Sequence, residues 1–362
     1  MSWLLAFLGF AALIVLHELG HFAVAKAVGM RVERFSLFFP PLLGRIQRGE
    51  TEYAIGSIPL GGYVRITGMN PHEPIPPEVE HRAYFRQPVW KRIAVIVAGP
   101  VVNIVLAFAI LWGLFMTIDG GRIVQPTSTI DEVEAGTPAA GTLRPGDTIL
   151  AVDGERGEPG RLIFALRGHA CAGEPEDGCR AAEPAAVTVL RDGREQTFSI
   201  RPFYDADPEV RAMRLGFSFA QDSRPATPVN AAAASGEQMW TVTATTVTKI
   251  VRIFDPEDRK ELSSLVGGYE TTRQAIKLDS RIALYVLALI SLSLGVINLF
   301  PFLPLDGGHI FWALAEKVSG RRIPVAVMER AGLVGFALVM ILFFVGLNND
   351  IGRLQGEGFG LR

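Results

Sequence analysis

The sequence predicts a polytopic α-helical membrane protein with four transmembrane helices, a membrane-associated β-hairpin or small sheet, and one extracytoplasmic α+β domain. Four apolar segments are each long enough to cross the roughly 30 Å hydrocarbon core of a bilayer. Hydrophobic residues make up 49% of the 362 residues and charged residues 20%, which suits a membrane protein with a soluble portion. The longest stretch between apolar segments is hydrophilic and is patterned as short strands.

These patterns divide the chain into nine parts. The apolar segments run over about 3–28, 93–118, 282–304 and 329–347. We expect, in order, a transmembrane helix at 1–29, a cytoplasmic β-hairpin region at 30–92, a transmembrane helix at 93–118, the extracytoplasmic domain at 119–219, a linker and amphipathic helical region at 220–280, a transmembrane helix at 281–309, a cytoplasmic loop at 310–328, a transmembrane helix at 329–347 and an extracytoplasmic tail at 348–362.

The first apolar segment contains an HExxH motif formed by His17, Glu18 and His21. On a helix the two histidines lie on one face, where both can bind one Zn²⁺, with the glutamate beside the metal as a general base. Short HExxH matches also arise by chance among ordinary surface histidines. Three ionisable residues inside a spanning segment are costly, however, and such residues tend to be functional. A shared metal ion is the simplest purpose for them.

Residues 30–92 contain alternating stretches at 31–39 and 51–59 that predict strands, followed by Gly61, Gly62 and Tyr63. Two interpretations stay open for this region. It can be a small hairpin exposed to solvent, or a hairpin that dips towards the membrane and offers a strand edge to an extended peptide. Adjacent glycines allow a close backbone approach, which suits the second interpretation.

Strand and turn patterns from Ser128 to Pro202 predict the soluble domain. The segment 141–154 contains a turn, a strand and a second turn, and 187–200 contains a hairpin around Asp192-Gly193. The segment G-x-L-x-x-G-D-x-I-x-x-V-D-G within 141–154 resembles a PDZ domain, and 214–219 is expected to add a closing strand. The insert between Gly168 and Ala185 looks like an elaborated loop.

The region that follows changes composition twice. Residues 220–235 are rich in Ala, Pro and Ser, which suggests a linker, and 236–254 carries apolar residues at helical spacing. Such a helix can lie at the membrane surface or pack on the soluble domain, and the sequence does not decide between them.

The third apolar segment ends in an irregular stretch that carries Asp306. Pro301, Pro304, Gly307 and Gly308 interrupt a regular helix here, and irregular backbone at membrane depth is tolerated where it is buried in protein or lines a watery cavity. Taken alone, Asp306 could be an ordinary carboxylate at a helix end. The fourth segment is a plain apolar anchor.

The distribution of basic residues predicts the topology. Ten fall between Lys26 and Arg92, and four more follow the third apolar segment. The positive-inside rule therefore places 30–92 and 310–328 in the cytoplasm, with both termini and the soluble domain outside. His17, His21 and Asp306 then lie at a similar depth, near the cytoplasmic face.

The same topology places Cys171 and Cys179 on the oxidising side of the membrane. A disulfide between them is expected across their short polar loop. Two free thiols remain the alternative.

Two imidazoles and one carboxylate leave a fourth tetrahedral position for water, as in a catalytic zinc site. Such a site lowers the pKa of water, and Glu18 can accept the proton. Metals that prefer soft ligands are disfavoured, because no cysteine is available to this site.

Five features in this order resemble the site-2 protease family, in its RseP-type branch of bacterial intramembrane zinc metalloproteases, over nearly the whole chain. They are the HExxH motif, Gly61-Gly62-Tyr63-Val64, Ala98-Gly99-Pro100-Val101-Val102-Asn103, the PDZ-like region, and Asn298 with Leu305-Asp306-Gly307. The resemblance implies His17, His21 and Asp306 as zinc ligands, Glu18 as catalytic base, Asn103 and Asn298 as substrate-positioning residues, and Gly61, Gly62 and Tyr63 in an edge strand that pairs with the substrate.

The resemblance also implies a location in the bacterial inner membrane and a substrate class. The usual substrate is a single-pass membrane protein, often an anti-sigma factor that another protease has already trimmed. The PDZ-like region would act as a size filter or gate, and its groove would suit a peptide C-terminus. Two departures are visible: Pro304 directly precedes Leu305-Asp306, and only one PDZ-like stretch is recognisable where RseP has two.

Other function classes are less well supported. A net charge of −2, without basic runs interleaved with aromatics, argues against a nucleic-acid partner. A transporter is disfavoured because the four segments show no repeat. The main alternative to a protease is a membrane-anchored PDZ scaffold in which the metal is structural or absent.

Overall fold

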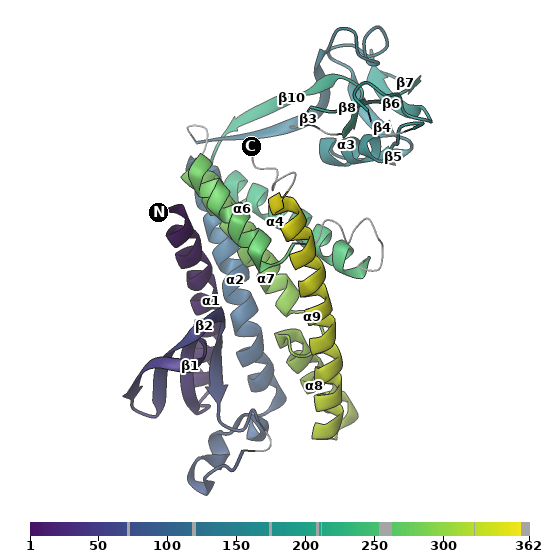
Figure 1. Cartoon of the computed structure of the whole chain (residues 1–362). Coiled ribbons are helices and arrows are strands. Elements are labelled where there is room, and N and C mark those ends of the chain that lie inside the picture. Colours follow the sequence, from purple (N-terminus) through teal and green to yellow (C-terminus); the bar gives the residue numbers. More distant parts are fainter. Residues whose placement is uncertain are drawn as a thin grey trace. The chain divides into compact units, whose positions relative to one another are not determined.

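The computed structural model describes residues 1–70, 73–117, 121–173, 176–207, 210, 212–252, 263–321 and 323–355 (Figure 1). The chain forms two compact units. One comprises Met1–Phe115 with Pro228–Leu361 and holds the long apolar helices; the other comprises Met116–Thr227. Ile118, Phe254, Arg322 and 356–362, which belong to predicted elements or basic clusters, lie outside the described residues.

Within the described part of the chain, four helices are long and apolar enough to cross a membrane, which confirms their predicted number. They are α1 (Ser2–Ala27), α2 (Val89–Thr117), α7 (Ser280–Asn298) and α9 (Val325–Gln355). The third apolar segment extends to residue 304 in the sequence, but its helix ends at Asn298, because Pro301 and Pro304 cannot continue the hydrogen-bond ladder. A separate helix, α8 (Asp306–Ser319), follows.

Helices α1 and α2 lie close together at Gly20. The buried residues of α1 fall on one face, and they include His17, Gly20 and His21. A Cβ atom at Gly20 would lie 2.6 Å from the carbonyl oxygen of Ala98 on α2, so any larger residue would push the helices apart. This contact brings the backbone of α2 directly behind the HExxH face.

The predicted hairpin is a small sheet of two long, antiparallel strands, β1 (Val32–Arg48) and β2 (Thr51–Ile66). Two short 3-10 helices, η1 (Pro77–Arg82) and η2 (Tyr84–Arg86), connect it to α2. Residues 34–37 of β1 have partners in 52–55 on one side and 62–65 on the other. In the described residues β1 is the only strand that pairs with 62–66, which therefore form an outer edge of the sheet.

The turn of this sheet is held by an ion-pair cluster around Glu50. Its carboxylate accepts two hydrogen bonds from Arg82, at 2.7 and 2.8 Å, and one from Lys26 at 3.1 Å. Hydrogen bonds from the Arg82 guanidinium, with a smaller contribution from the Lys26 ammonium, lower the pKa of Glu50 from 4.5 to about 2. The cluster ties the β1–β2 turn to η1 and to the end of α1.

This cluster predicts a defined pH dependence of stability. Because the folded-state pKa of Glu50 is depressed, its stabilising contribution is complete above pH 4.5 and is lost as the pH falls through about 2. Glu50→Gln should therefore lower the melting temperature of the detergent-solubilised protein at pH 6, and the difference from wild type should vanish near pH 2. Glu78→Gln, which alters an exposed carboxylate of η1, is the control. A Glu50→Gln difference that is independent of pH would contradict this assignment.

The second unit is built on a six-stranded sheet in the order β10-β3-β4-β6-β7, with β5 paired to β4. Its core includes Ile130, Ile149, Leu162 and Val187. A disulfide joins Cys171 and Cys179, whose Cα atoms are 6.0 Å apart. The elements are β3 (Arg122–Val133), β4 (Thr148–Val152), β5 (Glu155–Arg156), α3 (Pro159–Arg167), β6 (Ala185–Arg191), β7 (Arg194–Ile200), β8 (Phe203–Asp205), β9 (Ala212–Arg214) and β10 (Phe217–Pro225).

The predicted linker at 220–235 is largely structured. Strand β10 continues to Pro225, and helix α4 (Pro228–Val251) begins three residues later. The Ala-rich stretch forms the first turns of α4, since Ala is the best helix former and Pro is well tolerated in a first turn. Helix α4 packs on α7 within the first unit.

Helix α6 (Leu265–Leu278) completes the first unit and packs on α1 and α7. Its first turn is capped by the buried carboxylate of Asp350 on α9, which accepts hydrogen bonds from the backbone N–H groups of Ser264 and Gly267 at 2.7 and 2.9 Å. A carboxylate at a helix N-terminus satisfies donors that the helix itself cannot. Helix α9 is thereby attached to α6.

Candidate metal centre

The candidate metal ligands come from two helices that are far apart in the sequence. His17 and His21 lie one turn apart on α1, and Asp306 is the first residue of α8. Gly307 and Gly308 allow this first turn to pack on the preceding loop, since Cβ atoms there would lie 2.2 Å from the Leu299 carbonyl oxygen and 2.5 Å from the Leu303 nitrogen. Gly307 and Gly308 therefore help to place the carboxylate of Asp306 against α1.

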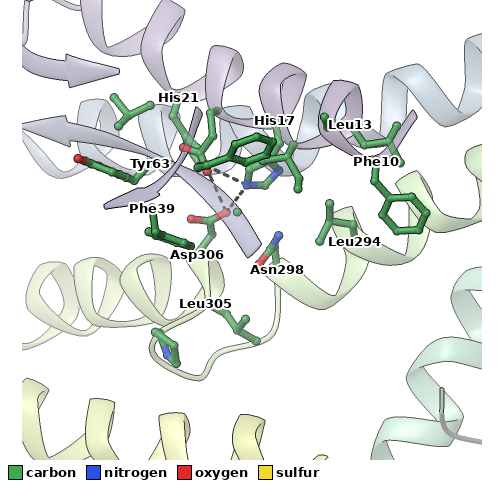
Figure 2. Close-up of a pocket in the computed structure, with 18 of the residues that line it drawn as sticks. Phe10, Leu13, His17, His21, Phe39, Tyr63, Leu294, Asn298, Leu305 and Asp306 are labelled. Atoms are coloured by element: carbon green, nitrogen blue, oxygen red, sulfur yellow. Dashed lines mark hydrogen bonds and ion pairs between the residues drawn. The ribbon is translucent and has the colours of Figure 1, made fainter. Parts of the chain in front are cut away.

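The three ligand atoms are spaced as a tetrahedral zinc site requires. His17 Nε2 lies 3.2 Å from Asp306 Oδ2 and 3.2 Å from His21 Nε2, and His21 Nε2 lies 3.4 Å from Asp306 Oδ2. Zinc–ligand bonds of about 2.0–2.1 Å at tetrahedral angles separate the ligand atoms by about 3.3–3.4 Å. Figure 2 shows the carboxylate of Asp306 directed at the two imidazoles.

Hydrogen bonding within the site also fits a cation. Asp306 Oδ2 is buried, and within the described part of the chain it has no hydrogen bond of acceptable geometry, although two imidazole nitrogens face it. The other ring nitrogen of His21, Nδ1, lies 2.8 Å from the carbonyl oxygen of Val95 and can donate to it. That bond leaves the Nε2 lone pair facing the carboxylate. Two imidazole nitrogens and one carboxylate oxygen that converge in this way are typical of a metal site.

Helix α2 forms the back wall of the site through Gly99. A Cβ atom at this position would lie 2.3 Å from His21 Nε2 and 2.9 Å from His17 Cε1. No side chain larger than hydrogen fits between α2 and the imidazoles. Gly99 in the second apolar segment is therefore part of the site.

The ligands open into a cavity of about 680 Å³ that Glu18 also lines. Most of the lining is apolar, and its residues come mainly from α1, β1, the edge of β2, α2, α6, α7 and the start of α8. Figure 2 shows Tyr63 and Phe39 on one side of the ligands and Phe10 and Leu294 on the other. The cavity can thus hold an apolar chain on either side of the candidate metal position.

Most of the candidate site residues predicted from the sequence line this cavity, but Asn103 does not. Gly61, Gly62, Tyr63 and Asn298 line it together with the candidate ligands. Asn103 is fully buried on α2 and faces the back of His17. Cys171 and Cys179 belong to the other unit.

Several lining residues were not anticipated. Phe39 stacks on Tyr63 with ring centroids 6.1 Å apart and an interplanar angle of 4°. Tyr269 of α6 packs near Phe10 and donates a hydrogen bond to the carbonyl oxygen of Trp3. Aromatic residues are common in apolar segments, so the sequence alone does not indicate that these residues line a cavity.

Apolar helices that hold an HExxH motif and a distant aspartate around one tetrahedral position define a metal-dependent hydrolase of the membrane. The chain belongs to peptidase family M50, the site-2 protease family, whose family model matches residues 5–342. It is therefore a membrane zinc metalloprotease, and the alternative of a scaffold without enzymatic activity is not supported.

Relatives of this chain are similar over nearly their full length. A protein of Mesorhizobium japonicum, mll0638, is 31% identical, with 92% of this chain and 93% of the relative covered. Zinc metalloprotease Rip1 of Mycolicibacterium smegmatis is 30% identical, with 92% of this chain and 90% of the relative covered. The protein RSc1411 of Ralstonia nicotianae is 29% identical, with 98% and 99% covered.

Proposed function

We propose that this protein hydrolyses a peptide bond within or near the transmembrane segment of a single-pass membrane protein, with His17, His21 and Asp306 as zinc ligands and Glu18 as the catalytic base. The observation that carries the proposal is the convergence of three ligand atoms, 3.2–3.4 Å apart, on an apolar cavity that Glu18 also lines. A site of this kind can receive an apolar peptide and cleave it at the metal.

The zinc ion and the side chains of the protein have separate roles in the proposed hydrolysis. Bound zinc supplies a Lewis acid that polarises a peptide carbonyl and acidifies water. Glu18 accepts a proton from the water as its oxygen attacks the carbonyl carbon, and then donates that proton to the amine as the C–N bond breaks. His17, His21 and Asp306 hold the ion, and Gly62 lies beside Glu18, because a Cβ atom at position 62 would be 2.9 Å from Glu18 Cγ.

The edge strand at 62–66 supports an extended binding mode for the substrate. Its residues line the cavity or border it, and one side of the strand has no partner strand within the described residues. An extended peptide can add to such an edge through backbone hydrogen bonds. In this mode Gly61, Gly62 and Tyr63 pair with the substrate, and Asn298 contacts it from the opposite wall.

The remaining sequence-based expectations enter as parts of the same proposal. The unit at 116–227 acts as a PDZ-like filter or gate, and β10, at one end of its sheet, offers an edge to a peptide C-terminus. The protein lies in the bacterial inner membrane with the active site nearer the cytoplasm and the PDZ-like unit outside, as the basic residues indicate. A trimmed protein of the anti-sigma-factor type is the substrate class that we favour.

The metal content of the purified protein tests the proposal directly. Wild-type protein is expected to hold one zinc ion per chain and to lose both zinc and proteolysis after dialysis against a chelator, with recovery on readdition of zinc. Asp306→Ala should hold no stoichiometric zinc, because two imidazoles alone bind the ion weakly. Asp279→Ala, which removes a carboxylate at the N-cap of α7, should retain it. Zinc content is measured by elemental analysis; full zinc occupancy in Asp306→Ala would remove Asp306 from the ligand set.

A further inference from the structure

Both candidate imidazole ligands have their second ring nitrogen directed at α2. His21 Nδ1 lies 2.8 Å from the carbonyl oxygen of Val95. His17 Nδ1 lies 3.2 Å from the side-chain amide nitrogen of Asn103, eight residues further along the same helix. The Nε2 atoms of both rings face Asp306. Helix α2 therefore supplies one contact behind each ligand.

The protonation of a metal-binding imidazole determines what Asn103 must offer. A neutral imidazole whose Nε2 lone pair faces a cation carries its proton on Nδ1 and needs an acceptor there. Asn103 Oδ1 is buried and has no hydrogen-bond partner within the described part of the chain. Rotation of the carboxamide by half a turn exchanges its oxygen and nitrogen, so that Oδ1 accepts from His17 Nδ1–H. The amide nitrogen then takes the buried place that Oδ1 occupies in this structure.

The position of Asn103 is fixed by α7 rather than by the cavity. Its side chain is fully buried, and its backbone carbonyl oxygen accepts a hydrogen bond from Ser291 Oγ at 2.9 Å. Gly295 lets α7 pack closely on this part of α2, since a Cβ atom at that position would lie 3.0 Å from the carbonyl oxygen of Pro100. Asn298 lines the cavity, whereas Asn103 does not belong to its lining. The two asparagines therefore face different neighbours.

We propose that Asn103 is a positioning residue, which accepts a hydrogen bond from His17 Nδ1–H and so fixes the tautomer and ring orientation of His17 for zinc. This role replaces the expected contact between Asn103 and the substrate. It rests on the proposed function in one respect, because it requires His17 to be a zinc ligand. Partners of this kind strengthen metal binding about 10–100-fold.

Zinc titration of the metal-free protein tests this role without a substrate. In detergent-solubilised protein, with a chromophoric chelator as competitor, Asn103→Ala and Asn103→Leu are expected to raise the zinc Kd about 10–100-fold. Asn103→Asp should restore the wild-type Kd or lower it, since a carboxylate oxygen is an acceptor at the same place. Asp279→Ala, whose carboxylate lies at the N-cap of α7, should leave the zinc Kd unchanged. Asn, Asp and Leu have side chains of similar size and branching, but only Asn and Asp carry an oxygen acceptor. A wild-type Kd in Asn103→Asp together with a raised Kd in Asn103→Leu therefore separates an acceptor role from packing alone.

Two outcomes would overturn the inference. One is a wild-type Kd in Asn103→Ala; the other is a Kd in Asn103→Asp that is raised as much as in Asn103→Leu, which would mean that Asn103 donates to the ring. If the apolar variants do not fold, Asn103→Asp decides alone, with a Kd at or below wild type in support and a tenfold rise against. Failure of the wild-type protein to bind zinc would instead contradict the proposed function itself.

Discussion

Glu18→Gln is expected to slow peptide hydrolysis by about 10²–10⁴-fold, the usual contribution of a general base, while one zinc ion per chain is retained. The substitution keeps the size of the side chain and its place beside Gly62 but removes the group that accepts the proton from water. Glu18 is not one of the three residues whose ligand atoms converge. Loss of activity should therefore be separable from loss of metal.

Two readouts measure this effect. Elemental analysis gives the zinc content, and cleavage is followed as the loss of a membrane-embedded substrate in reconstituted vesicles. His17→Ala is the comparison, because it should lose both zinc and activity. Membrane fragments that accumulate only in cells expressing Glu18→Gln would identify the natural substrate. Wild-type cleavage by Glu18→Gln would exclude Glu18 from proton transfer.

Gly99→Ala is expected to abolish both zinc binding and proteolysis, although alanine is the better helix former. The added Cβ atom would lie 2.3 Å from His21 Nε2 and 2.6 Å from His21 Cε1, so the ring must leave its position. Backbone movement is limited as well, because Gly20 holds α1 against Ala98 of α2. One methyl group should thus act as strongly as the removal of a ligand.

Gly113→Ala is the matched control for this prediction. Gly113 lies on the same helix, but a Cβ atom there meets no other atom within 4 Å. It should keep full zinc content and be stabilised by up to about 1 kcal/mol through helix propensity. Zinc content and melting temperature of both variants give the result. Full occupancy in Gly99→Ala would show that α2 can withdraw from the imidazoles.

The sequence predicts the membrane part of this fold well because hydrocarbon imposes a simple rule. A spanning helix must satisfy its own backbone, so it needs one long apolar run, and hydropathy detects such runs directly. The ends of these helices are harder to predict. Composition is apolar up to residue 304, yet α7 stops at Asn298, and the Ala-rich stretch that begins α4 has the composition of a linker. Local composition does not record which neighbours a segment packs on.

The candidate site follows from the sequence in part. His17 and His21 are linked by helical spacing alone, and the positive-inside rule places Asp306 at their depth. The role of Gly99 is not predictable, since a missing side chain carries no information about what lies opposite. Asn103 presents a similar difficulty. A polar residue in a transmembrane helix can face the substrate or a metal-binding side chain, and only the packing of α2 against α1 distinguishes the two.

In the proposed binding mode, the open edge at 62–66 limits which polypeptides can be processed. The backbone amides of an intact helix already donate to carbonyl groups one turn away. A helical segment therefore has no free amide and carbonyl groups to pair with an edge strand. The transmembrane helix of the substrate must therefore first unfold locally, near the peptide bond that is hydrolysed. Segments with glycine, proline or asparagine at that depth should be processed fastest, and a polyleucine anchor should resist.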